Sequence, residues 1–189
     1  MKKVLFIFAL LLATMTAGAQ DIQLTPDGAY ERKEVVTVDS VSAAVLYDRA
    51  MIALTDWTGP DGKAKAGIDY QNQETHTVIY KGTFSLGFKN VFLGDGWDRY
   101  ANFTLKVRCK DGRAQVTVTV GTVTFIYTRG NIERSCTIAV LKEAVNKSKG
   151  AKHERGETML ADIVGTANVI MAAMSAKLRD AGNSGDDNF

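Results

Sequence analysis

The sequence feature that most constrains the fold is a pair of alternating runs of apolar and polar residues on either side of Asp111-Gly112. Asp-Gly is typical of a two-residue type I′ hairpin loop, in which both central residues need a positive φ. With this loop, every apolar residue of one run meets an apolar residue of the other. The predicted pairs are Val107 with Val116, Leu105 with Val118, Phe103 with Val120, Lys106 with Thr117 and Arg108 with Gln115. A slip of one residue would place the valines opposite charged positions, so turn and pattern predict one register.

The apolar parity changes at Gly121, after which Val123, Phe125 and Tyr127 share a face. We therefore expect a bulge or bend at Gly121, where the missing side chain makes an irregularity inexpensive. Further strands are expected at 30–38, around Ile68 and Tyr70, and over 77–88, where apolar residues again alternate with polar ones. Thr128 to Asn131 should end the last strand of this series.

Helical spacing of apolar residues predicts three helices. They are expected at 43–57, with Ser40 or Ser42 as the N-cap, over a short stretch from Ile138 to Val145, and from about Glu157 to Ala181. Amphipathic helices must bury their apolar stripes, so the elements together predict an α+β fold: an antiparallel sheet of about five strands with helices packed on one face.

The N-terminus has the pattern of a secretory signal peptide. Lys2 and Lys3 precede an apolar run from Val4 to Ala13, and Ala17-Gly18-Ala19 offers small residues for cleavage. We expect 1–19 to be removed, 20–28 to be a disordered leader, 29–182 to be a single domain that includes the C-terminal helix, and 183–189 to be a disordered tail. The protein should be exported to the periplasm or the extracellular space. It should not be a lipoprotein, because no cysteine follows the cleavage point, and it should have no membrane span after cleavage.

Loss of Lys2 and Lys3 with the signal peptide leaves 21 basic and 21 acidic side chains. A neutral exported domain has no overall field that attracts nucleic acid, so no nucleic-acid partner is expected. His76 and His153 lie in no ligand spacing, and neither a metal site nor a cofactor is predicted. In an oxidising compartment Cys109 and Cys136 either form one disulfide or remain two free thiols, and spacing alone does not decide between the two.

Two features are candidate binding residues. Four cationic side chains, Lys106, Arg108, Lys110 and Arg113, should lie on the exposed face of the hairpin. They either bind an acidic ligand or simply keep the sheet soluble. Trp97 lies in the run Gly94 to Asp98, which is expected to be a Gly-rich loop. There the indole could stack on a sugar ring, or it could only anchor the loop.

Several of these segments resemble a known family. Tyr30-Glu31-Arg32-Lys33, Leu46-Tyr47-Asp48-Arg49-Ala50, Tyr80-Lys81-Gly82-Thr83 and Lys110-Asp111-Gly112-Arg113 look like the exported Bacteroidetes domain of unknown function with a TATA-binding-protein-like (TBP-like) fold. The resemblance covers about 29–128 and implies an antiparallel sheet with helices on one face. It implies no catalytic residues, and a fold shared with a DNA-binding protein does not transfer DNA binding.

The expected function is that of a non-enzymatic binding or adaptor module of the cell envelope, with an envelope protein or glycan as its unknown partner. An alternative is a hydrolase of envelope polymers whose carboxylates are scattered along the sequence. A third alternative is a structural subunit, with Met171 and Met174 on an oligomer face; core packing is the other use of these methionines.

Overall fold

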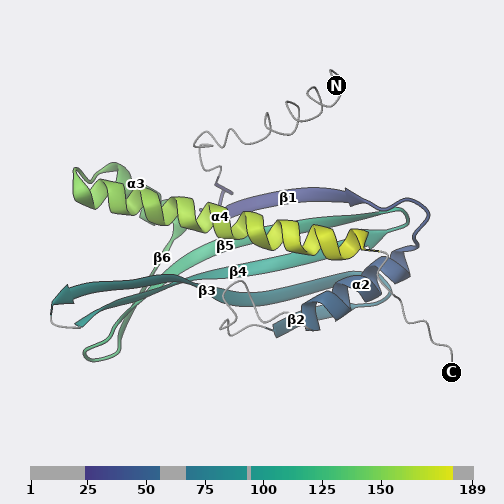
Figure 1. Cartoon of the computed structure of the whole chain (residues 1–189), viewed down its shortest axis with the longest axis horizontal. Coiled ribbons are helices and arrows are strands. Elements are labelled where there is room, and N and C mark those ends of the chain that lie inside the picture. The colour runs from purple at the N-terminus through teal and green to yellow at the C-terminus, as the bar shows by residue number, and fades with distance from the viewer. Residues whose placement is uncertain (1–23, 56–66, 93–94, 181–189) are drawn as a thin grey trace, which may run out of the picture.

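The computed structural model describes residues 24–55, 67–92 and 95–180. Six antiparallel strands form one long sheet, and three helices lie on one of its faces (Figure 1). The strands are β1 (Tyr30–Thr37), β2 (Gly67–Asn72), β3 (Thr77–Phe92), β4 (Asp95–Lys110), β5 (Arg113–Tyr127) and β6 (Ile132–Thr137). The helices are α2 (Ala43–Thr55), α3 (Ile138–Asn146) and α4 (Ala151–Arg179). The predicted α+β fold is confirmed, with β6 as an additional strand.

The β4–β5 hairpin has the register that its sequence predicts. Val107 pairs with Val116, Leu105 with Val118 and Phe103 with Val120. Only Gly112 of the two turn residues has a positive φ, at 72°, so the turn is not of type I′. The Asp111 side chain has a second role, because its Oδ1 accepts a hydrogen bond of 2.8 Å from the backbone N–H of Ala43. The hairpin turn thus supplies a carboxylate to the positive N-terminus of α2.

Gly121 is the extra residue of a β-bulge, as predicted. Asn102 pairs with Thr122 and Phe103 with Val120, which leaves Gly121 without a partner on β4. On the other side of β5, β1 pairs with 113–120 and β6 pairs with 122–127. The two strands therefore follow one another along the same side of β5 and meet at the bulge.

The core lies between the sheet and the helices. Leu46 of α2, Leu105 of β4, Val118 of β5 and Ile163 of α4 are each fully buried there. Met171 and Met174 are also buried, so they pack in the core and do not form an oligomer face. By length and composition α4 could cross a membrane, but its apolar stripe packs on the sheet as that of a core helix.

Three boundaries differ from the sequence prediction. Leu24 to Gly28 do not belong to a disordered leader, because the Gly28 N–H donates to the Thr25 carbonyl at 2.8 Å and Leu24 forms a bridge with Tyr30. The six residues of β6 are mostly exposed and lack an apolar alternation, so no strand was predicted there. Helix α4 begins at Ala151, six residues before the predicted start at Glu157. The prediction missed these first turns because they are polar and carry no apolar stripe. The predicted signal peptide, residues 20–23, Trp57 and residues 181–189 lie outside the described residues.

Candidate functional site

Two cross-strand rows on the helix-facing side of the sheet form the floor of a pocket. The first row is Arg99–Phe125–Arg134, on β4, β5 and β6. In the second row Lys89 pairs with Trp97, and Trp97 pairs with Tyr127, which does not itself line the pocket. The rings of Trp97 and Tyr127 lie 5.1 Å apart between centroids, with their planes tilted by 41°. Each row thus places aromatic side chains beside cationic ones on the same face of the sheet.

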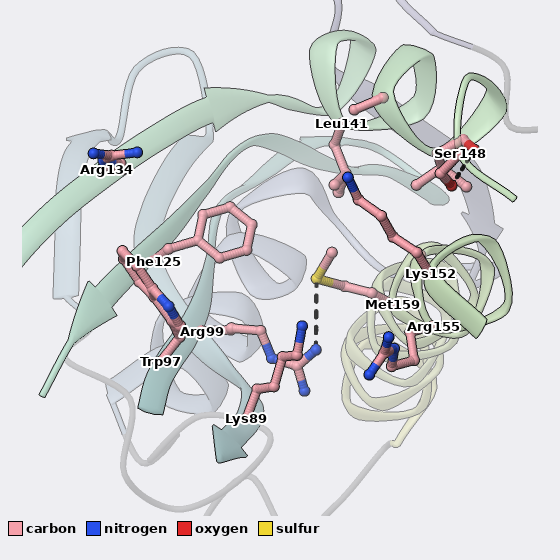
Figure 2. A pocket seen from close by; sticks show the side chains of 13 residues that line it. Lys89, Trp97, Arg99, Phe125, Arg134, Leu141, Ser148, Lys152, Arg155 and Met159 are labelled. Carbon is pink, nitrogen blue, oxygen red and sulfur yellow. Dashed lines mark hydrogen bonds between the residues drawn. The ribbon is translucent and has the colours of Figure 1, made fainter. Parts of the chain in front are cut away.

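Helices α3 and α4 provide the other wall. Lys152, Arg155, Gly156 and Met159 recur at the spacing that puts residues on one face of α4. Leu141, Ala144 and Val145 of α3 and Ser148 complete the lining (Figure 2). The turn between the helices is fixed at the Val145 carbonyl, which accepts hydrogen bonds from Ser148 Oγ at 2.7 Å and from His153 Nδ1 at 2.9 Å.

The two helices approach closely where they border the pocket. A Cβ added to Gly156 would lie 2.4 Å from Val145 Cγ2, so only glycine fits there without a shift. This contact brings the first turns of α4, with Lys152 and Arg155, over the aromatic floor.

Arg99 connects the two walls of the pocket. Its Nε donates to the Gly87 carbonyl at 3.2 Å, at an irregularity of β3 where Gly87 has a φ of +79°. Its Nη1 lies 4.0 Å from Met159 Sδ on α4 (Figure 2). The guanidinium is therefore held inside the pocket by groups that leave its positive charge uncompensated.

The pocket has a volume of about 490 Å³, within the range of small-molecule sites. Its lining contains five cationic side chains: Lys89, Arg99, Arg134, Lys152 and Arg155. Among the described residues no carboxylate lines it, and no group of three metal-ligating side chains occurs. The pocket is thus an apolar and aromatic cavity surrounded by positive charge.

The structure separates the residues that the sequence singled out. Trp97 lines the pocket, but it lies within β4 and not on a loop, and Asp98 points to the opposite face of the sheet. The four cations of the hairpin, Lys106, Arg108, Lys110 and Arg113, lie on the sheet face away from the helices, as predicted. Lys106 and Lys110 are 7 and 11 residues from Arg99 on β4, so the hairpin cations of this strand lie ~23 to ~35 Å along it from Arg99.

The disulfide alternative is wrong, because both cysteines are free. Cys109 pairs with Ala114 and Cys136 pairs with Val123, positions nine residues apart along β5. That separation is ~30 Å, whereas bridged cysteines need Cα atoms within ~7 Å. Burial raises the pKa of the Cys109 thiol to about 12 and also raises the pKa of Cys136.

Sequence reasoning missed the five cations of the pocket. The signal for Arg99 was present, because extending the hairpin register past the bulge pairs it with Phe125. Arg134 lies on the unpredicted β6, and Lys152 and Arg155 lie in the polar first turns of α4. Only the packing of α4 against the end of the sheet brings these residues together.

The comparisons with known proteins agree with this architecture. Residues 33–122 match the model of a family described as a domain of unknown function (DUF4468) with a TBP-like fold. A crystal structure of a DUF4468 family protein from Bacteroides ovatus matches with a TM-score of 0.57 and 18% identity, over 86% of this chain and 91% of that one.

A TBP-like protein from Parabacteroides distasonis matches with a TM-score of 0.54 and 11% identity, over 82% of this chain and 96% of that one. No curated protein matches the sequence. Lys89, Trp97 and Arg99 fall inside the matched segment, whereas Arg134, Lys152 and Arg155 follow it. Residues 33–122 of the chain are thus similar to the DUF4468 family of domains of unknown function, and the chain has a TBP-like fold.

Proposed function

We propose that the protein is an exported, non-enzymatic binding module of the cell envelope, and that it binds an anionic ligand in the basic pocket. The observation that carries the proposal is the local excess of charge. Five cations line one cavity in which no described lining residue is acidic, although the chain without its first 19 residues is formally neutral.

Such an arrangement opposes folding slightly, because like charges repel one another even where four of the five side chains are exposed to solvent. A bound anion removes this repulsion and gains charge-assisted hydrogen bonds from arginine and lysine. The aromatic floor adds apolar contact area, which is the usual composition of a small-molecule site with a few directing polar groups.

The hydrolase alternative finds no support in this pocket. Glycoside hydrolysis typically uses two carboxyl groups on either side of the scissile bond, and none is present among the described lining residues. The hairpin cations remain a second candidate for an acidic partner, since Arg108, Lys110 and Arg113 border a separate hollow of about 280 Å³.

Native mass spectrometry of the protein purified without detergent from its own host tests the proposal. We expect a non-covalent anionic species on the wild-type protein that dissociates on denaturation. The double variant Lys152→Gln/Arg155→Gln should carry at least tenfold less of it, whereas the matched variant Lys106→Gln/Arg108→Gln should retain it.

Two results would contradict the proposal. One is the absence of any bound species on the wild-type protein. The other is a loss confined to Lys106→Gln/Arg108→Gln, which would move the binding site to the hairpin. Circular dichroism of each variant verifies that the fold is intact.

A further inference from the structure

We propose that the ligand of the basic pocket is an anionic amphiphile, with one alkyl or acyl chain that ends in a carboxylate or a phosphate. This inference rests on the proposed function and specifies its ligand class. It follows from how apolar, polar and charged groups are distributed over the pocket wall.

The inner wall of the pocket is apolar. Leu141, Val145 and Met159 are buried side chains of the helices, and Phe125 faces them from β5 (Figure 2). Water beside such a wall is readily displaced by an apolar group, since removing apolar surface from water is favourable. The wall therefore accommodates a hydrocarbon chain better than a hydroxylated one.

Neutral hydrogen-bonding groups are scarce in the pocket. Ser148 has the only side-chain hydroxyl among the described lining residues, and that hydroxyl already donates to the Val145 carbonyl at 2.7 Å. A sugar would bring several hydroxyls into the cavity, and each would lose hydrogen bonds to water without a replacement. This argues against a neutral glycan as the occupant.

The positions of the cations suit a single anionic headgroup. Lys89 pairs with Trp97, which is two residues from Arg99 on β4. The Arg99 guanidinium contacts Met159 of α4, and Arg155 lies one helical turn before Met159. Three positive side chains therefore converge from β3, β4 and α4. Long basic side chains can lay their methylenes on an apolar wall while their charged ends stay at the water boundary. The positive charges favour a ligand with an anionic headgroup, and the apolar wall beneath them favours a ligand with a hydrocarbon chain.

Tryptophan fluorescence provides the test, because Trp97 lines the pocket and Trp57 is the second tryptophan of the two in the sequence. The Trp57→Phe variant leaves Trp97 as the reporter. It is titrated with octanoate, decanoate, dodecanoate and dodecyl phosphate, each below its critical micelle concentration. Acetate and inorganic phosphate test the headgroup alone, dodecyl maltoside tests a chain without charge, and alginate tests a polyanion without a chain.

We expect saturable binding of dodecanoate, with roughly tenfold tighter binding for every two methylenes added to the chain. Acetate and inorganic phosphate should bind at least 100-fold more weakly. Arg155→Gln should weaken dodecanoate binding at least fivefold, whereas Lys177→Gln, which removes one charge at the other end of α4, should leave it unchanged.

The source of the amphiphile is decided by a further arm with phosphatidylcholine vesicles that contain lysophosphatidate, a membrane lipid with one acyl chain and a terminal phosphate. Binding to vesicles that dodecanoate displaces would identify a membrane lipid, and binding of the free amphiphiles alone would identify a free acid or phosphate ester. Both outcomes support the inference.

Other outcomes overturn it. If alginate binds and dodecanoate does not, the ligand is a hydrophilic anion, so the inference is wrong while the proposed function stands. If dodecyl maltoside binds as tightly as dodecanoate, the charge has no role and the ligand class is wrong. If none of the probes binds, both the inference and the proposed function fail.

Discussion

The two ends of β5 both pair with β4, on either side of the Gly121 bulge, but they differ in what covers them. Before the Gly121 bulge, Val116, Val118 and Val120 are fully buried beneath the helices. After it, Phe125 and Tyr127 are half-buried, and Phe125 pairs with Arg99 on β4 and with Arg134 on β6. An alternation of apolar and polar residues therefore produces a closed core at one end and an open, charged pocket at the other (Figure 2).

Stability and ligand binding are expected to depend on opposite ends of the sheet. Burial of apolar surface in the covered half supplies most of the free energy of folding. The open end contributes fewer buried contacts and holds charges that repel one another. Residues at this end are therefore expected to affect ligand binding more than folding, and substitutions can separate the two.

The largest effect is expected in the covered half. Leu105→Ala deletes a fully buried side chain of the central strand β4 and should lower the free energy of unfolding by about 3 kcal/mol. Tyr127→Ala at the open end should cost only about 1 kcal/mol, because its ring is half-buried and packs mainly on Trp97. Urea denaturation followed by circular dichroism measures both. Equal losses would mean that the two ends do not differ in stability.

A somewhat smaller effect is expected where the pocket joins the core. Gly156→Ala should cost about 2 kcal/mol, because the new Cβ would lie 2.4 Å from Val145 Cγ2. The matched control is Gly165→Ala on the exposed face of the same helix, where nothing lies within 4 Å. It should stabilise the protein by about 1 kcal/mol through helix propensity.

A double-mutant cycle tests whether the loss of stability in Gly156→Ala comes from the contact with Val145. In Gly156→Ala/Val145→Ala the second substitution removes the methyl groups that clash, so the double variant should lose less stability than the two single variants together. Additive losses would show that the close contact between α3 and α4 does not exist in solution.

Smaller still is the expected effect of the pocket charges on folding. Arg134→Gln and Lys152→Gln remove exposed cations of the pocket, and each should change the free energy of unfolding by less than about 0.5 kcal/mol. Urea denaturation followed by circular dichroism measures both changes. A loss above about 1 kcal/mol for either variant would assign these side chains to the stability of the fold and weaken their proposed role in binding.

The smallest effect concerns the cysteines. A reducing agent should leave the thermal unfolding midpoint unchanged, because both thiols are free. Burial raises the pKa of Cys109 to about 12, so its thiol is protonated in the folded protein at pH 8 and should react with Ellman's reagent only after unfolding. Reaction of two thiols per protein in denaturant would agree with free cysteines, and reaction of no thiol would indicate a disulfide.

The sequence predicted the fold better than the site, for a physical reason. Register is a local property, so the Asp111-Gly112 turn and the valines of β5 were enough to predict the β4–β5 pairing and the Gly121 bulge. Strand β6 was missed because its exposed residues carry no alternation and its pairing with β5 provides the order.

The candidate site depends on tertiary packing. Trp97 could be singled out as a rare aromatic residue, but Arg134 on β6 and Lys152 and Arg155 on α4 are distant from it in the sequence. Residues such as Lys152 and Arg155 look like ordinary solvated helix residues until α4 is placed across the sheet. Charge clusters of this kind are visible only in the folded chain.

A crystal structure of the protein with dodecanoate tests the central claim most directly. We expect a chain that lies against Phe125 and Met159, with its carboxylate in contact with Arg99 or Arg155. A carboxylate at Arg108 and Lys110 of the hairpin, or an empty pocket at a dodecanoate concentration that saturates the Trp97 fluorescence, would contradict it.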